Sequence, residues 1–350
     1  MTRAALLSVA TAAPPHVLAQ TEVVARARAA FGDRYAEFER MSAVFETAGI
    51  QTRRGVKPID WYLQPQGWPQ RTEAYLEGAR ELFIQAASLA LERAGVSAAE
   101  VDAVVTVSST GIATPSLEAR AHRAMGFRDD VLRTPVFGLG CAGGVSGLAL
   151  AARLAEARPG SVVLFVTVEL CTLAFRLDKL TKANIVATAL FGDGAAACVL
   201  RAGAGGGLAT VAGAGEHTWP ETLDIMGWAV DPEGFDVIFA RAIPPFAARH
   251  LGPALRGVLQ RQGLVAEDIG RFVCHPGGTK VIAALEKTLD LPTGALDHER
   301  AVLAEHGNMS APTALFVLER VLAAGPPERM ALAALGPGFT ASSVTLERAA

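Results

Sequence analysis

The chain has little net charge and no basic cluster. Its 350 residues include 32 Lys and Arg against 35 Asp and Glu, so the formal net charge is −3 at pH 7. Binding to nucleic acid needs a clustered basic face that neutralises phosphates, and we therefore expect no nucleic-acid partner. Hydrophobic residues make up 51% and charged residues 19%, which is too apolar for a disordered chain. At about 150 residues per domain, this length predicts two domains or one duplicated domain.

Cysteines are few, and long apolar runs are missing. The stretch from Met330 to Leu346 is interrupted by Gly336-Pro337-Gly338 and is not a membrane span. Residues 1–15 weakly resemble a signal peptide, but the apolar run is short, and we predict a first β-strand that ends at Pro14-Pro15. These features favour a cytoplasmic protein without an integral membrane segment. No CxxC pair or metal-ligand spacing is present, so we interpret the four cysteines as reduced thiols: Cys141, Cys171, Cys198 and Cys274.

A helix–loop–strand unit occurs twice in the sequence. In the first copy a helical pattern ends at Gly95, and an apolar, β-branched strand follows at residues 101–107. In the second copy the helix ends at Gly263, and Ile269 and Val273 occupy the positions of the strand. The offset between the copies is 168 residues, from 263 − 95. The repeat predicts a duplicated α/β architecture.

Later elements keep this offset. The helical run 145–152 corresponds to 313–320, and Cys141 falls beside Asn308. We therefore expect an α/β fold of two similar halves, with mostly parallel sheets covered on both faces by helices. The halves are predicted to be residues 1–205 and 206–350, joined near the glycine-rich segment 203–207.

One cysteine lies at the head of a predicted helix. Cys141 stands between glycines, after an apolar strand and before the run that begins at Val145. Free N–H groups and the positive dipole end of a helix stabilise a thiolate, so Cys141 is the best candidate nucleophile, with a thiolate at neutral pH. The alternative is a small buried cysteine without chemistry. The same segment contains a GxGxxG pattern from Gly138 to Gly143, which alone is weak evidence for dinucleotide binding.

Two further polar residues occupy comparable positions in the second half. His275 ends an apolar strand, where side chains enter a cleft, and is a candidate base or oxyanion donor. Asn308 follows Gly307 at a predicted helix start. Each has an ordinary alternative, a core histidine and an N-cap asparagine. Because the duplication aligns Cys141 with the Asn308 turn, we expect both helix heads and His275 to face one central cleft.

A thiol nucleophile, an imidazole and a carboxamide can form a thioester and stabilise an enolate on a second thioester. Papain-like proteases also use Cys with His and Asn, but there the acyl-enzyme is hydrolysed. In this chain both supporting residues lie in the second of two duplicated halves. This arrangement favours carbon–carbon bond formation between thioesters over hydrolysis.

At these residues the chain resembles the type III polyketide synthases, the chalcone synthase-like branch of the thiolase superfamily. The resemblance implies a thiolase-like fold with a layered αβαβα core and no metal or redox cofactor. It covers most of the chain, and its motifs occur in the family's order and spacing: Gly140-Cys141-Ala-Gly-Gly, Ala189-Leu-Phe191-Gly-Asp-Gly, His275-Pro-Gly-Gly, Gly307-Asn308-Met-Ser310 and Gly336-Pro337-Gly338.

The resemblance also implies a catalytic triad of Cys141, His275 and Asn308. Cys141 would take the starter from an acyl-CoA, and His275 and Asn308 would promote decarboxylation of malonyl-CoA. Phe191 matches a phenylalanine that gates the cleft between the CoA tunnel and the cavity. A second gating phenylalanine, expected within residues 234–244, is replaced in our alignment by Val237, and Phe235 and Phe239 lie close by as alternatives.

The segments around Glu169 and Lys182 resemble bacterial enzymes that make alkylpyrones and alkylresorcinols from long fatty acyl starters. Thr114 stands where the family inserts a residue into the partner's cavity, which implies a homodimer. Further substrate-binding candidates on this resemblance are Glu169, Cys171, Ala174, Ser310 and Gly338, and the nearest CoA-binding candidates are Arg40, Arg53 and Gly277.

Two other functions remain open at this point. A 3-oxoacyl-ACP synthase III type enzyme has the same fold and triad and makes a single condensation, although the His275-Pro-Gly-Gly motif and the Gly336-Pro337-Gly338 loop argue against it. A catalytically silent thiolase-fold partner protein is the second alternative, against which the intact triad argues.

Overall fold

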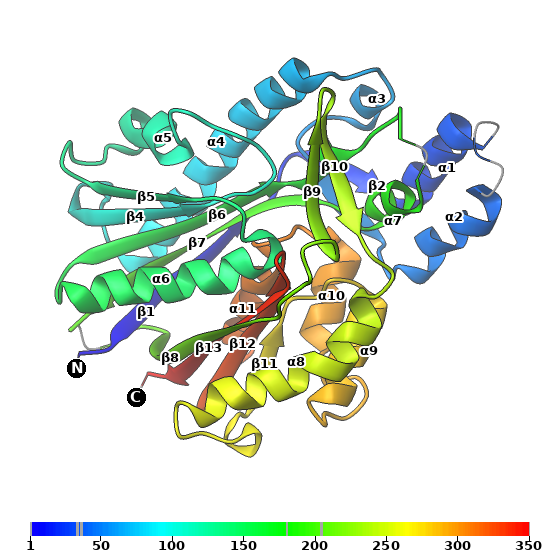
Figure 1. Ribbon diagram of the computed structural model, residues 1–350. Helices are drawn as coiled ribbons and strands as arrows, with labels where there is room; N and C mark the ends of the chain where they lie inside the picture. Colours follow the sequence, from blue (N-terminus) through cyan, green and yellow to red (C-terminus); the bar gives the residue numbers. More distant parts are fainter. Residues whose placement is uncertain (1, 33–34, 36–37, 180, 204–205, 350) are drawn as a thin grey trace.

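The computed structural model describes residues 2–349 except 33–34, 36–37, 180 and 204–205. Within this part of the chain, nine strands form one mixed sheet in the order β11-β12-β13-β8-β1-β7-β6-β4-β5. The sheet divides into two parts, because β1 and β8 pair through only two residue pairs, Ala5 with Thr210 and Leu6 with Ala209. Figure 1 shows these two parts with helices packed on them.

The N-terminal part begins with the predicted first strand and ends before the glycine-rich segment. The helix predicted to end at Gly95 is α4, and Gly95 closes it in the left-handed conformation, at φ 63°. The core elements of this half are β1 (Ala4–Ala12), α4 (Trp68–Ala94), β4 (Val101–Val107), α5 (Leu117–Met125), β5 (Leu132–Val136), α6 (Gly143–Ala157), β6 (Val162–Leu170) and β7 (Asp193–Ala202).

The C-terminal part repeats this arrangement. Its strand order, β8-β13-β12-β11, matches β1-β7-β6-β4 of the first half, and α8 and α11 occupy the places of α4 and α6. The predicted duplication is therefore present in the fold. The elements are β8 (Ala209–Thr218), α8 (Ile243–Gln260), β11 (Arg271–Cys274), α9 (Thr279–Thr288), α10 (Asp297–His306), α11 (Thr313–Ala323), β12 (Arg329–Gly336) and β13 (Thr340–Arg348).

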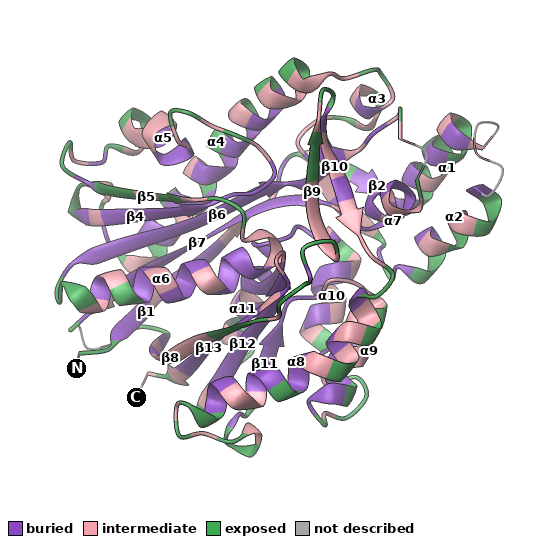
Figure 2. Ribbon diagram, in the orientation of Figure 1, coloured by how far each residue is buried: buried purple, intermediate pink, exposed green. Residues whose placement is uncertain are grey.

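The layers follow the predicted αβαβα order. Helices α6 and α11 lie between the two parts of the sheet, where one apolar cluster includes residues from both halves. Helix α4 covers the outer face of the first part, and α8 and α9 cover that of the second. Figure 2 shows the strands and the central helices as mostly buried. Burial on both sides explains why these strands are nearly continuous apolar runs.

The prediction of mostly parallel sheets is wrong. Strand β4 pairs in parallel with β5 and β6, and β11 with β12, but the pairings among β6, β7, β1, β8, β13 and β12 are antiparallel. In the second half, a tight turn between consecutive strands makes the pairing antiparallel. The Pro337-Gly338 turn joins β12 to β13 as a hairpin, so the chain reverses where a helical crossover was expected. The predicted boundary at residue 205 lies outside the described residues.

Smaller elements surround the cleft between the halves. They are β2 (His16–Ala19), α1 (Gln20–Phe31), α2 (Phe38–Thr47), β3 (Thr52–Gly55), α3 (Ile59–Tyr62), α7 (Lys182–Leu190), β9 (Met226–Asp231) and β10 (Gly234–Phe239). Strands β9 and β10 form a separate antiparallel hairpin, and β2 pairs with β3. In Figure 1 the hairpin stands beside the point where β6, β7 and α7 meet.

Candidate active site

The two central helices meet head to head, as the duplication predicted. A short 3₁₀ turn, Gly140–Ala142, carries Cys141 immediately before α6. A Cβ atom added to Gly144 would lie 2.2 Å from the carbonyl oxygen of Ala311, just before α11. No side chain fits at this crossing, so glycine allows the N-terminus of α6 to touch the turn that carries Asn308.

The turn before Cys141 also depends on glycine. Gly140 has φ 48°, and a Cβ atom there would lie 2.6 Å from the ring of Pro337. Side chains other than glycine are disfavoured in this left-handed region and would clash with the proline. The β12–β13 hairpin turn therefore fixes the backbone that presents Cys141.

Hydrogen bonds fix the Asn308 side chain in one orientation. Its Oδ1 accepts from the backbone N–H of Ser310 at 2.8 Å, and its Nδ2 donates to the carbonyl of Gly277 at 3.4 Å. Ser310 adopts a left-handed backbone, φ 57°, and its Oγ donates to Cys141 Sγ at 3.5 Å. The amide N–H₂ of Asn308 is thereby turned toward the segment that follows His275.

His275 lies directly after β11, as predicted. Its backbone N–H donates to the carbonyl of Ala333 on β12, and its side chain is buried. Neither ring nitrogen has a hydrogen-bond partner among the described residues. A Cβ atom added to Gly277 would lie 3.7 Å from Nε2, so the ring faces the glycine whose carbonyl binds Asn308. The imidazole is left able to bind a substrate oxygen or a proton.

Burial sets the protonation states of the two titrating groups. Desolvation, together with the charge of Glu169, raises the pKa of the Cys141 thiol to about 11, against the opposing hydrogen bond from Ser310. Desolvation lowers the pKa of His275 to about 4. The site at neutral pH therefore pairs a thiol with a neutral imidazole. The expected thiolate is wrong for this state of the site, because burial outweighs the helix terminus.

A chamber in front of Cys141 brings together residues from both halves. Cys141, Asn308 and Ser310 share it with Cys171, Phe191 and Val237, all predicted from the sequence. It is lined by Ser109, Thr110, Gly140, Cys141, Cys171, Phe191, Met226, Gly227, Trp228, Val237, Ile238, Phe239, Asn308, Ser310 and Pro337.

Glu169 lies behind this chamber rather than in its lining. The carboxylate is fully buried and accepts hydrogen bonds from the backbone N–H of Ser109 and the hydroxyl of Thr110, which do line it. Burial raises the pKa of Glu169 to about 8. Its place at the end of β6 was predicted, but it supports the wall and does not face substrate directly.

Two further pockets flank the chamber, and one phenylalanine borders each. Phe191, with Cys171, lines both the chamber and an apolar pocket between α1, α3 and α7. Phe239 lines both the chamber and a groove between α2, α7 and α9. The two rings pack edge to face with centroids 6.4 Å apart. Phe191, predicted between the CoA tunnel and the cavity, lies between the chamber and the apolar pocket, and Phe239 lies between the chamber and the groove.

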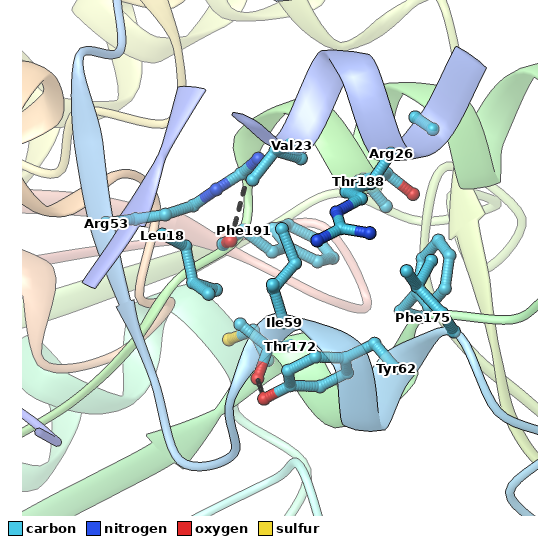
Figure 3. Close-up of a pocket in the computed structure, with 14 residues that line it drawn as sticks. Leu18, Val23, Arg26, Arg53, Ile59, Tyr62, Thr172, Phe175, Thr188 and Phe191 are labelled. Atoms are coloured by element: carbon cyan, nitrogen blue, oxygen red, sulfur yellow. Dashed lines mark hydrogen bonds between the residues drawn. The ribbon is translucent and has the colours of Figure 1, made fainter. Parts of the chain in front are cut away.

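The apolar pocket is shown in Figure 3. Leu18, Val23 and Ile59 form apolar walls, while Tyr62 and Thr172 share a 2.7 Å hydrogen bond at its edge. The complete lining is Leu18, Val23, Arg26, Ala27, Arg53, Ile59, Tyr62, Leu63, Cys171, Thr172, Phe175, Ala187, Thr188 and Phe191.

The groove on the other side carries positive charge. Lys182, Arg241 and Lys280 line it, none of its described lining residues is acidic, and Gly277, a predicted CoA contact, is among them. Arg53, another predicted CoA contact, is 2% exposed and lines the apolar pocket instead. Arg40 is exposed on α2, one residue before Met41 of the groove lining.

Three other predicted substrate contacts lie outside the chamber. Ala174 is buried at the end of a 3₁₀ turn, Cys171–Ala174, and lines neither the chamber nor the apolar pocket. Gly338 makes the hairpin turn, at φ 76°, and its neighbour Pro337 reaches the chamber instead. Thr114 is exposed, away from this chain's own chamber.

Sequence reasoning missed Trp228 on the β9–β10 hairpin and named Phe239 only as a neighbour of Val237. Trp228 Nε1 donates to the carbonyl of Ser109 at 2.8 Å, which holds the hairpin over the chamber. Phe239 follows Val237 by two residues, so both side chains lie on one face of β10, and both line the chamber.

The comparisons with known proteins agree with this geometry. The model for the N-terminal domain of chalcone and stilbene synthases matches residues 1–204, and that for the C-terminal domain matches residues 211–348. The chain belongs to the chalcone and stilbene synthase family. It is a type III polyketide synthase, an acyltransferase that acts on CoA thioesters.

Relatives of this polyketide synthase are bacterial enzymes of the same length. The 1,3,6,8-tetrahydroxynaphthalene synthase of Streptomyces peucetius subsp. caesius is 41% identical over 97% of this chain and 92% of the relative. A putative chalcone synthase of Bacillus subtilis is 35% identical over 96% of both. The crystal structure of 1,3,6,8-tetrahydroxynaphthalene synthase from Streptomyces coelicolor superposes with a TM-score of 0.93 over 99% of both chains, at 28% identity.

The described residues hold no group of three or more His, Cys, Asp or Glu side chains that could bind a metal ion. The same part of the chain has no helix that is long and apolar enough to cross a membrane.

Proposed function

We propose that this type III polyketide synthase condenses a long-chain fatty acyl-CoA starter with malonyl-CoA and cyclises the product to an alkylpyrone or alkylresorcinol. The observation that carries the proposal is the apolar pocket that adjoins the chamber at Phe191 and Cys171. An apolar chain gains about 0.8 kcal/mol for each methylene it buries, so such a pocket favours an aliphatic starter over a small one.

The first half-reaction forms an acyl-enzyme at Cys141. The neutral His275 imidazole accepts the thiol proton, Sγ attacks the thioester carbonyl, and CoA leaves with a proton. A neutral base is needed here because burial keeps Cys141 protonated. The acyl chain on Sγ would then extend past Cys171 into the apolar pocket.

The second half-reaction uses His275 and Asn308. Malonyl-CoA loses CO₂, and the N–H groups of the two side chains stabilise the enolate oxygen that develops on its thioester. The enolate carbon attacks the Cys141 thioester, and the released thiolate takes up one proton from solvent, relayed by His275, which ends the cycle as a neutral imidazole. Loss of CO₂ drives the condensation, so we expect no metal or redox cofactor to be required. Activity should therefore survive exhaustive treatment with a chelator.

The outer end of the apolar pocket is bordered by Arg26. Arg26 lines the pocket, pairs with Asp60 at 3.3 Å and keeps 45% of its side chain exposed. A chain longer than the pocket can therefore pass the half-exposed guanidinium and reach the surface between α1 and α3. Charged side chains that rim an apolar channel in this way bury their stems and keep their heads in water.

A second candidate function is favoured by one comparison. The relative that is 41% identical is a tetrahydroxynaphthalene synthase, and the ten carbons of a naphthalene equal five two-carbon malonyl units. An enzyme of that kind would use malonyl-CoA as both starter and extender, and the apolar pocket would stay empty during the reaction.

Product analysis separates the two candidates. The enzyme is incubated with malonyl-CoA alone and with a graded series of acyl-CoAs from acetyl to stearoyl, and products are identified by mass spectrometry. We expect alkylated pyrones or resorcinols from the long-chain starters and the highest kcat/KM among them. A tetrahydroxynaphthalene as the main product, unchanged by added acyl-CoA, would show that the second function is the correct one.

We also expect a homodimer. Three apolar side chains are more than half exposed at this edge of the sheet: Leu132 on the edge strand β5, Phe137 directly after it, and Ile112 in the loop between β4 and α5. Thr114 is exposed in the same loop. A second copy placed against this edge would cover the patch and bring Thr114 to its neighbour. Light scattering should give twice the 36.5 kDa chain mass, and Phe137→Glu should give monomers. A monomeric parent protein would rule this arrangement out.

A further inference from the structure

We propose that Arg53 is a positioning residue for decarboxylation, which holds the peptide on which Asn308 rests. The inference depends on the role proposed above for Asn308. Arg53 lies on β3 in the N-terminal half, and Asn308 lies in the C-terminal half. The hydrogen bonds that link them through the backbone around Phe191 therefore join the two halves at the reaction chamber.

Arg53 binds the backbone of Phe191. Its Nη1 donates to the Phe191 carbonyl oxygen at 3.2 Å, and Figure 3 marks this hydrogen bond with a dashed line. The residue is 2% exposed, and Nη2 has no hydrogen-bond partner among the described residues. A cation this deeply buried is too far from the surface to hold a CoA phosphate, and its hydrogen bond is to the backbone of Phe191.

The Phe191 peptide in turn supports Asn308. The backbone N–H of Asn308 donates to the carbonyl of Leu190 at 2.8 Å, and that of Gly192 donates to the carbonyl of Asn308 at 3.1 Å. Phe191 and Asn308 thus form a parallel bridge outside the main sheet. Because two hydrogen bonds tie these segments, a shift of Phe191 moves the Asn308 backbone and its side-chain amide.

The Arg53 stem packs against the same two segments. A Cβ atom added to Gly192 would lie 3.1 Å from Arg53 Cβ, and one added to Gly307 would lie 3.5 Å from it. Gly192 follows Phe191, and Gly307 precedes Asn308. The aliphatic part of Arg53 therefore lies between the residues on either side of the bridge, while its guanidinium holds the carbonyl within it.

The buried carboxylate of Asp193 balances the charge of Arg53. Asp193 shares its carboxylate with the backbone N–H groups of Val56 and Thr172 and the Thr172 hydroxyl, and it attracts the Arg53 cation electrostatically. Desolvation lowers the pKa of Arg53 to about 10, so it remains charged at neutral pH. Removing a cation from beside a buried carboxylate is destabilising, but Asp193 keeps its hydrogen bonds to Val56 and Thr172 in the variant. We therefore expect an Arg53→Met protein to fold, with a lower midpoint of thermal unfolding than the parent.

The test compares Arg53→Met and Arg53→Lys with a neighbour on the same strand. Arg54→Met is the matched control, because the Arg54 guanidinium is exposed and donates to the carbonyl of Pro15. Each purified protein is assayed for decarboxylation of malonyl-CoA without starter, for the KM of malonyl-CoA, and for acyl transfer to Cys141 by intact mass. Asn308→Ala is measured in parallel, and thermal unfolding is recorded for every variant.

We expect Arg53→Met to lower kcat for decarboxylation by about 10- to 100-fold, since small displacements of catalytic groups cost that much. KM should stay within about twofold, acyl transfer to Cys141 should persist, and Arg53→Lys should recover part of kcat. Arg54→Met should match the parent.

A normal kcat for decarboxylation in Arg53→Met, together with a defect in Asn308→Ala, would overturn the positioning role of Arg53 and leave the role of Asn308 intact. Normal decarboxylation in Asn308→Ala would instead overturn the role of Asn308. Equal loss of acyl transfer and decarboxylation in Arg53→Met would show a general structural defect.

Discussion

The turn of Cys141 in the N-terminal half and the turn of Asn308 in the C-terminal half occupy equivalent positions but present different functional groups. The Cys141 turn follows β5 and the Asn308 turn follows α10, and they precede the central helices α6 and α11 at positions related by the 168-residue repeat. The first presents a thiol, and the second presents a carboxamide held by Ser310 and Gly277. Duplication thus supplies two helix heads at one chamber, and the halves divide the reaction between them.

The comparison also shows how the supporting contacts differ. The Cys141 turn is fixed by close packing, because Gly140 lies against Pro337 and Gly144 against the Ala311 carbonyl. The Asn308 turn is fixed by hydrogen bonds, including those to the Phe191 peptide. A nucleophile needs room to receive an acyl group, whereas an oxyanion donor needs a fixed direction.

The largest expected effect separates acyl transfer, assigned to the N-terminal half, from decarboxylation, assigned to the C-terminal half. Cys141→Ala should abolish acyl transfer and polyketide formation, while malonyl-CoA decarboxylation, which uses the C-terminal turn, continues. Intact mass after exposure to acyl-CoA should show one adduct on the parent protein, located at Cys141, and none on the variant. Cys198→Ala is a suitable control, because Cys198 is buried within β7. An adduct on Cys171, Cys198 or Cys274 would contradict the assignment.

The next prediction concerns the protonation of the thiol. Burial raises the pKa of Cys141 to about 11, so the thiolate fraction should grow roughly tenfold for each pH unit below that value. Between pH 6 and pH 9, the rate of alkylation by iodoacetamide should therefore rise by about 1000-fold. The rate is followed by mass spectrometry on Cys141. A rate that is already constant above pH 6 would restore the thiolate that the helix terminus suggested.

The positions of the catalytic turns could be predicted from the sequence, but the residues that contact these turns from distant segments could not. Cys141, His275 and Asn308 each follow a strand or a glycine within a short local pattern, so their places could be predicted from the chain and its repeat. Arg53 and Trp228 make hydrogen bonds to segments distant in the sequence, to the carbonyls of Phe191 and Ser109, and no local pattern predicts such contacts. The pKa of Cys141 was misjudged for the same reason, because desolvation depends on residues from both halves.

A smaller effect is expected in the groove, which both halves line. Lys182 comes from α7, and Arg241 and Lys280 come from the C-terminal half. Arg241→Ala or Lys280→Ala should raise KM for CoA thioesters by about tenfold, equivalent to about 1.4 kcal/mol of lost phosphate binding. Thioesters of N-acetylcysteamine lack these phosphates, and their KM should be unchanged in the same variants. An equal increase for both kinds of thioester would mean that the cations do not bind phosphate.

The smallest expected effect concerns the apolar pocket, which is lined by residues of the N-terminal half alone. A change in this pocket therefore tests most directly whether the two halves have separate roles. Thr188 on α7 lines this pocket, and its hydroxyl donates within its own helix to the carbonyl of Asn184. Thr188→Phe should fill the space beyond Phe191 and shift the best starter to shorter chains. About 0.8 kcal/mol per excluded methylene corresponds to roughly a fourfold loss of kcat/KM for each one.

The matched variant is Thr188→Val, which keeps the size of the side chain and should keep the parent preference. Both variants are compared with the parent over the series from acetyl-CoA to stearoyl-CoA, and malonyl-CoA decarboxylation is measured alongside. Decarboxylation should be equal in all three, since the C-terminal turn is untouched. A Thr188→Phe profile identical to the parent would show that the acyl chain does not enter this pocket. A loss of decarboxylation would instead show that the two halves are not separable, because the pocket wall at Phe191 is also the support of Asn308.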